Sequence, residues 1–259
     1  MILAGCVGDS ANNPDSGTDS GADVANDTAI DAPSTWCSKS VHAFCADFDG
    51  VSKPSDGWDS TDVEGTGVLL IDNTNYTSSP NCFQSSIGAV ADAGAWVNDA
   101  ILARTLPVTQ ASPALHTEWD MRVSVGATVP APVTLVLYQV YLNGTSLVQI
   151  GVDGVGWLLW ARAGATGGTR YALSATPPST GWVHFILDVT FASTATGSVK
   201  LQMTAGDAGA ATTLADLTNL QTTTETTAQT VSIVPGLVDP NEPTPAYQAR
   251  YDDITLDVQ

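Results

Sequence analysis

Apolar and polar residues alternate along much of the chain after residue 35, and a period of two residues predicts β-strands. In residues 117–123, three apolar side chains alternate strictly with three charged ones. The apolar set is Trp119, Met121 and Val123, and the charged set is Glu118, Asp120 and Arg122. Residues 183–189 and 254–258 repeat the pattern, and no segment sustains a helical period. Strands with one apolar face must bury it against a second sheet, so the sequence predicts an all-β, two-sheet antiparallel jelly-roll sandwich.

Two turn signals, Asn-Gly at 143–144 and Asp-Gly at 153–154, separate the apolar runs of residues 133–162. Such pairs supply the positive φ angles of a type I′ turn, which predicts three strands joined by two-residue loops. In this register Leu142 lies opposite Thr145, and one face of the hairpins is apolar. The other face then carries aromatic, amide and guanidinium groups, namely Tyr138, Gln149, Trp160 and Arg162.

These groups predict a ligand-binding surface. Aromatic rings stack on sugar rings, while amides and charged groups orient hydroxyls. Side chains from other strands complete the predicted binding set, namely Trp182, His184, Glu118, Asp120 and Arg122. The alternative is that Trp160 and Trp182 are packing residues, and that His116 and His184 are hydrogen-bonded structural histidines.

Charge narrows the range of partners. The 259 residues carry a formal net charge of −19. The charged side chains that precede Trp36 are all aspartates, and none is basic. Nucleic acids are held by clustered Lys and Arg, so a nucleic-acid partner is excluded. An acidic balance favours solubility or association with divalent cations.

The start of the chain predicts an anchor and a tether. Residues 1–6 contain Leu3-Ala4-Gly5-Cys6, which resembles a bacterial lipobox with Cys6 as the lipidated residue, although the apolar segment before it is short. Residues 7–35 repeat Asp among Gly, Ser, Asn and Pro, which predicts a disordered linker. We expect a domain at 36–259, held outside the cytoplasm on the bacterial envelope and touching the membrane through lipid alone.

Short motifs across residues 36–259 resemble the laminin-G-like, concanavalin A-like jelly-roll domains found in surface lipoproteins of myxobacterial type. The motifs are Phe44-Cys45-Ala46-Asp47-Phe48-Asp49, Ser79-Pro80-Asn81, Trp182-Val183-His184 and Tyr251-Asp252-Asp253-Ile254. The resemblance implies a structural calcium ion where the first and last strands meet. Its ligands would include the carboxylates of Asp47, Asp49, Asp252 and Asp253, since calcium favours six to eight oxygen ligands.

Three cysteines remain if Cys6 is lipidated, which leaves one disulfide and one spare thiol in an oxidising compartment. The resemblance implies the pair Cys37 and Cys45. The pair Cys45 and Cys82 is the alternative.

Catalytic chemistry receives less support from the sequence. Related jelly rolls that hydrolyse β-glucans carry Glu-x-Asp-x-x-Glu on one strand, whereas residues 118–123 lack the second Glu. Arg122 is expected to neutralise Glu118 or Asp120 instead. A lyase needs a Tyr or His base near a cation, and four residues are candidates for convergence on one face, namely His184, Tyr138, Arg122 and Arg162.

The favoured interpretation is therefore a lipid-anchored, non-catalytic, lectin-like module for a glycan or another surface polymer. The alternatives are a polysaccharide-degrading enzyme, either a lyase or a glycoside hydrolase, and a protein-binding adhesin or envelope component. The sequence leaves the oligomeric state open.

Overall fold

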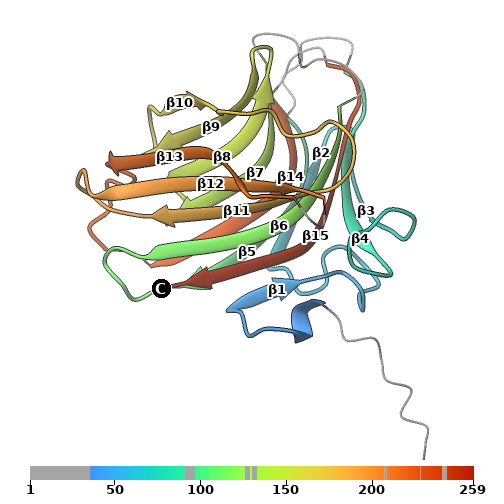
Figure 1. Cartoon of the computed structure of the whole chain (residues 1–259), viewed down its shortest axis with the longest axis horizontal. Helices are drawn as coiled ribbons and strands as arrows, with labels where there is room; N and C mark the ends of the chain where they lie inside the picture. Colours follow the sequence, from blue (N-terminus) through green and yellow to red (C-terminus); the bar gives the residue numbers. More distant parts are fainter. Residues whose placement is uncertain are drawn as a thin grey trace, which may run out of the picture. The chain divides into compact units, whose positions relative to one another are not determined.

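The computed structural model describes residues 36–90, 97–125, 129, 133–206, 209–227, 229–240 and 244–259. They form one compact unit of two antiparallel sheets packed face to face, which confirms the predicted jelly-roll sandwich (Figure 1). A turn of 3-10 helix, η1 (Trp36–Ser38), precedes the strands. Within these ranges we find no helix with the length and apolar character needed to cross a membrane. The predicted anchor at Cys6 and the predicted linker at 7–35 lie outside the described residues.

The strands divide into an eight-stranded sheet, which we call sheet A, and a seven-stranded sheet, which we call sheet B. Sheet A contains, in spatial order, β13 (Thr212–Leu220), β12 (Gly197–Ala205), β11 (Val183–Thr190), β6 (Ala114–Val125), β15 (Tyr247–Val258), β4 (Cys82–Ile87) and β3 (Gly67–Asp72), with β1 (Phe44–Ala46) paired to β15. Sheet B contains β10 (Thr169–Ala172), β9 (Gly156–Arg162), β8 (Ser146–Asp153), β7 (Thr134–Leu142), β14 (Thr230–Pro240), β5 (Val97–Pro107) and β2 (Ser60–Glu64).

Stacked aromatic rings join the two sheets at the centre of the core. Trp119 of β6 and Tyr138 of β7 are fully buried, and their ring centroids lie 3.9 Å apart. Phe185 of β11 stacks on Trp119 at 5.3 Å. The Tyr138 hydroxyl lies 2.8 Å from Thr117 Oγ1, which satisfies both buried polar groups. The predicted alternation on β6 and β11 is confirmed, so Glu118 and its polar neighbours on these strands face away from the core.

The hairpin between β7 and β8 has one more loop residue than the sequence predicts. Asn143 and Gly144 have φ angles of 52° and 69°, as an Asn-Gly turn requires. Thr145 donates its backbone N–H to Leu142 O at 3.1 Å but stays outside the strand pairing, so Leu142 pairs with Ser146. The expected pairing of Leu142 with Thr145 is therefore wrong by one residue.

A β-bulge at Leu137 takes up this extra residue, and it decides which side chains of β7 reach solvent. The register shifts next to Leu137, so Leu137 and Tyr138 both enter the core. The buried Tyr251 hydroxyl of β15 donates a 2.7 Å hydrogen bond to the Leu137 carbonyl and so stabilises the bulge. Because a one-residue shift exchanges the faces of a strand, Gln139 and Tyr141 point outward. The prediction that Tyr138 lies on the ligand-binding face is wrong.

The two ends of the domain meet at β1 and β15, where Phe44 pairs with Leu256. Cys37 and Cys45 form a disulfide, as the resemblance implied. Cys82 is a free, buried thiol that donates to Asn75 O at 2.8 Å, so the alternative pairing is wrong. β1 is thus attached both to the last strand and to the residues that precede it.

Candidate functional site

The predicted ligand-binding residues do not form one surface. Tyr138 lies in the core, and the others divide between the outer faces of the two sheets, which point in opposite directions. Gln149, Trp160 and Arg162 lie on sheet B. Glu118, Asp120, Arg122, Trp182 and His184 lie on or beside the strands of sheet A. The predicted convergence of His184, Tyr138, Arg122 and Arg162 is therefore wrong.

Cross-strand pairing on sheet B brings two adjacent rows of side chains together across neighbouring strands. The first row is Ser232, Tyr141, Leu147 and Arg162, and the second is Val234, Gln139, Gln149, Trp160 and Arg170. We call Gln139, Tyr141, Gln149, Trp160 and Arg162 the sheet B site. It combines an aromatic ring, two amides, a phenol and a guanidinium within three neighbouring strands, β7, β8 and β9.

Tyr141 is the acid–base candidate of the sheet B site. Its hydroxyl donates a hydrogen bond to Gln139 Oε1. Burial raises the pKa of Tyr141 above its usual range, while the positive charge of Arg162, in the same row beyond Leu147, opposes the rise. The sequence prediction missed both Gln139 and Tyr141 because it did not include the bulge.

Arg162 supplies a positive charge that no carboxylate of the described residues neutralises. Its Nη2 donates to Thr145 O at 3.1 Å, and its guanidinium lies 5.8 Å from the Trp160 ring centroid. Its Nε is buried without a hydrogen-bond partner in the described part of the chain. By contrast, Arg170 binds Asp153 through Nε and Nη2 at 2.8 and 3.0 Å. Arg162 is thus the cation left to meet an anionic ligand here.

A hollow of about 330 Å³ adjoins these residues on sheet B. Its lining is Thr134, Val136, Gln149, Leu158, Trp160 and Arg170. The Gln149 amide makes no side-chain hydrogen bond to any other described residue, so its donors and acceptor are free for a ligand. An apolar floor with an aromatic ring and a free amide is typical of a carbohydrate subsite.

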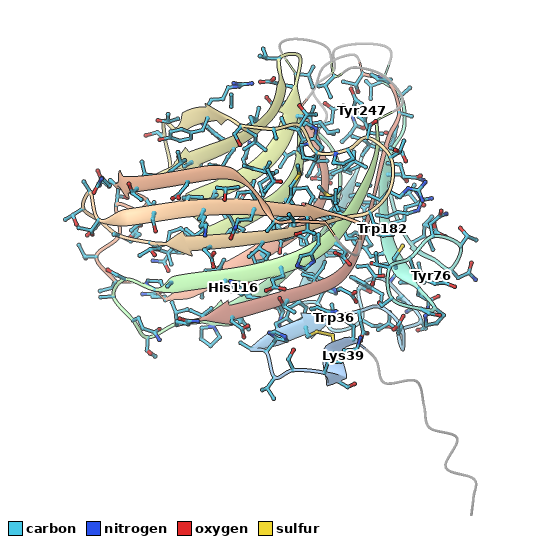
Figure 2. The ribbon with its side chains drawn as sticks, in the orientation of Figure 1. Trp36, Lys39, Tyr76, His116, Trp182 and Tyr247 are labelled. Carbon is cyan, nitrogen blue, oxygen red and sulfur yellow. A yellow bond between two sulfur atoms is a disulfide. The ribbon has the colours of Figure 1, made fainter. Side chains whose placement is uncertain are left out.

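The outer face of sheet A carries a chain of alternating carboxylates and imidazoles. His116 lies on β6 in Figure 2 and contacts Asp188 at 2.7 Å and Glu118 at 2.8 Å. His184 contacts Asp120 at 2.9 Å through Nδ1 and Glu118 at 3.4 Å through Nε2. Glu118 therefore bridges two histidines, and Asp188 and Asp120 close the two ends.

These contacts shift the protonation of the cluster. The hydrogen bond to Glu118 is the largest cause that raises the pKa of His116 to about 9, and that to Asp120 does the same for His184. The two imidazoliums hold the pKa of Glu118 well below its usual range. Arg122 donates to Asn75 Oδ1 at 3.0 Å, so the expected ion pair of Arg122 with Glu118 or Asp120 is absent and the histidines take its place.

The four carboxylates expected to hold calcium mostly meet protein donors. Asp47 and Asp49 accept the backbone N–H groups of Cys37 and Asn81 at 3.0 and 3.2 Å. Both oxygens of the buried Asp252 accept hydrogen bonds, from backbone or hydroxyl groups of Thr77 and Ser78 and from the Asp253 backbone. Asp253 accepts a 2.8 Å hydrogen bond from the Ser78 hydroxyl.

Burial raises the pKa of Asp252 to about 8 and that of Asp253 to about 7. Among the described residues we find no group of three or more His, Cys, Asp or Glu side chains that could hold a metal ion. Most of these carboxylate oxygens already accept hydrogen bonds from the protein, so calcium at this position stays a prediction, which chelation can test.

The described residues thus form a β-jelly-roll sandwich whose sheet B carries an outer surface of aromatic, amide and guanidinium groups. The sequence matches no family model and no curated protein. Among solved structures it resembles an endo-β-1,4-glucuronan lyase from the fungus Trichoderma reesei, with a TM-score of 0.65 and 14% identity over 84% of this chain and 95% of that one. An alginate lyase of type PL-14 from Aplysia kurodai gives a TM-score of 0.62 and 8% identity over 84% and 99%. The cellulose-induced protein Cip1 gives a TM-score of 0.55 and 12% sequence identity, over 82% of this chain and 96% of that one.

Identities this low show a shared fold. The comparisons nevertheless correct the order of the functional hypotheses. The sequence favoured a non-catalytic lectin-like module, whereas several of the similar structures are named as polysaccharide lyases. The alternative, a polysaccharide-degrading enzyme, is the better supported interpretation. A glycan polymer as partner agrees with both.

Proposed function

We propose that the protein is a polysaccharide lyase that cleaves a uronic-acid polymer by β-elimination at the sheet B site. The observation that carries the proposal is the placement of Tyr141 in one row with Arg162, a cation without a carboxylate partner among the described residues. A lyase requires a proton-transfer group beside a positive charge that meets the uronate carboxylate.

Substrate binding follows from the side chains around Tyr141. Trp160 offers a ring for stacking under one sugar unit. Arg162 and the free Gln149 amide would hold the uronate carboxylate, which lowers the barrier to removing the adjacent proton at C5. Gln139 Oε1 accepts a hydrogen bond from the Tyr141 hydroxyl and so orients the phenol ring.

Tyr141 would carry the proton transfers. As tyrosinate, its oxygen takes the proton from C5, the C5 electrons form the C4–C5 double bond, and the C4–O4 bond breaks. The departing O4 then takes the proton from the Tyr141 hydroxyl, which returns the residue to its starting state. The tyrosinate is the reactive form, and burial raises the pKa of Tyr141 above its usual range, so we expect the rate to rise throughout the alkaline range.

The similar structures add support through their names, since glucuronan and alginate are both uronic-acid polymers. A neutral glucan would leave Arg162 without a partner. We therefore favour a uronate polymer over a β-glucan as substrate.

The test measures the unsaturated product by its ultraviolet absorbance after incubation with alginate, glucuronan or polygalacturonate. The expected result is product from at least one polymer and a loss of roughly a hundredfold or more in Tyr141→Phe, the range of acid–base catalysis. Tyr247→Phe is the matched control, because the buried Tyr247 hydroxyl has no hydrogen-bond partner among the described residues. If the wild type gives no product from the three polymers between pH 6 and about 10, the proposal is wrong. Full activity in Tyr141→Phe would remove Tyr141 from the mechanism.

A further inference from the structure

We propose a second carbohydrate site on the opposite side of the sandwich, at Trp182, that binds neutral sugar units. It uses residues of sheet A and of the loop between β3 and β4, and it shares no side chain with the sheet B site.

Two adjoining hollows meet at Trp182. One, of about 280 Å³, is lined by Thr77, Asp120, Trp182, His184, Thr204 and Gly206. The other, of about 430 Å³, shares Thr77, Trp182 and Gly206 with the first and continues to Tyr76 and Thr180. Because three lining residues are common to both, the hollows form one groove, which we call the Trp182 groove.

Two aromatic side chains border the Trp182 groove. Trp182 is half-buried and immediately precedes β11, and Tyr76 is 39% exposed in the loop between β3 and β4. Figure 2 shows both on the same side of the molecule. A large ring held in place by its neighbours yet open on one side is suited to stacking on a pyranose.

Polar groups at the floor of the groove are held in place before any ligand binds. His184 Nδ1 lies 2.9 Å from Asp120 Oδ1, and its Nε2 lies 3.4 Å from Glu118, so the imidazole is fixed from both sides. Asp120 Oδ2 accepts no hydrogen bond from the described residues and is free for a sugar hydroxyl. The hydroxyls of Thr180 and Thr204 add donors and acceptors along the walls. Fixed polar groups bind at a lower entropic cost than mobile ones.

Charge selects neutral sugars. No Lys or Arg is among the described residues that line either hollow. Asp120 is the carboxylate among the described lining residues. The charged His184 is already held between Asp120 and Glu118, so a uronate would find no unpaired cation in this lining, whereas the sheet B site has Arg162. The two faces are thus selective for different sugars. The Trp182 groove would bind a neutral polysaccharide independently of binding or cleavage at the sheet B site.

The test is affinity electrophoresis of the whole protein in gels that contain galactomannan, xyloglucan or a soluble β-glucan, with alginate and chitosan gels alongside. We expect at least one neutral polymer to retard the wild type, and Trp182→Ala to weaken that retardation at least tenfold. Trp182→Phe should keep part of it, and Trp36→Ala should keep all of it, because Trp36 lines neither hollow nor the sheet B site. Equal urea midpoints for the variants would show that they are folded.

Absence of retardation by all three neutral polymers would overturn the proposal, as would equal retardation of the wild type and Trp182→Ala. Retardation by chitosan alone would show attraction of a cation by Asp120 instead of sugar recognition. Loss of neutral binding in Trp160→Ala but not Trp182→Ala would place that binding on sheet B. Since the gel requires no cleavage, failure of the lyase proposal leaves this test intact, and failure here leaves the lyase test intact.

Discussion

The histidine–carboxylate chain on sheet A predicts a specific loss of stability in alkaline solution, and Glu118→Gln tests it. Glu118 contacts both His116 and His184, whose pKa values rise from 6.5 to about 9. A folded-state pKa above the unfolded one means that the folded protein holds the proton more tightly. The stabilisation is therefore complete below about pH 6.5 and is lost as the pH rises through about 9.

The magnitude follows from the shifts and from solvent exposure. The rise from 6.5 to about 9 corresponds to about 3 kcal/mol for each histidine if no solvent screened the charges. The side chains of His116 and His184 are 32% and 30% exposed, so we reduce this to about 1 kcal/mol each, the upper end for exposed ion pairs. The low pKa of Glu118 reports the same contacts from the other partner and is not added. Wild-type protein should thus lose about 2 kcal/mol of unfolding free energy between pH 6.5 and about 10.

Urea unfolding at a series of pH values measures this loss. Glu118→Gln should start about 1 kcal/mol less stable at pH 6.5 and lose only about half as much on going alkaline, because Asp188 and Asp120 still contact the imidazoles. Asp216→Asn removes an exposed acid of β13 in the same sheet and should follow the wild-type curve. A wild-type curve that is flat from pH 6.5 to 10, or a variant curve parallel to it, would refute the assignment of charged histidines to this cluster.

Two further predictions concern the fold. Tyr251→Phe should lower the unfolding free energy by about 1–2 kcal/mol, measured in urea, because it leaves the Leu137 carbonyl without its buried donor; an unchanged midpoint would mean that the bulge needs no such support. If the predicted calcium ion is bound, chelation with EGTA should lower the thermal midpoint of unfolding, and added calcium should restore it. The bound ion would stabilise the folded state by roughly 3 kcal/mol when the calcium concentration exceeds its Kd a hundredfold. A midpoint indifferent to EGTA would count against the calcium prediction.

Most of the fold was predictable because strands that cover a core on one face alternate apolar and polar residues with a period of two. The alternation around Trp119 and Phe185 gave the inward faces of β6 and β11 correctly, and the Asn-Gly pair gave the position of the first tight turn. The Cys37–Cys45 bond agreed with the family resemblance. These features depend on neighbours close in sequence or on a face that must be apolar, and both leave local signals.

The functional face was harder to predict because it depends on two departures from ideal pairing. Thr145 stays outside the ladder, and Leu137 bulges, yet no glycine or proline marks the bulge. One signal was present: Gln139 shares its parity with Leu137, so a regular strand would have buried an amide beside an apolar core. Such a conflict between polarity and period is itself an indication of a bulge.

The bulge also explains how a residue in one sheet can govern chemistry on the far side of the other. Tyr251 belongs to β15 in sheet A, and its hydroxyl crosses the core to the Leu137 carbonyl of β7. Without the shift at Leu137, the alternation of β7 would place Tyr138 outside and turn Tyr141 inward, and the row that holds Arg162 would lose its phenol. The placement of the proposed acid–base group therefore rests on a buried hydrogen bond, and sequence motifs read strand by strand do not report it, because the donor lies 114 residues away in the chain.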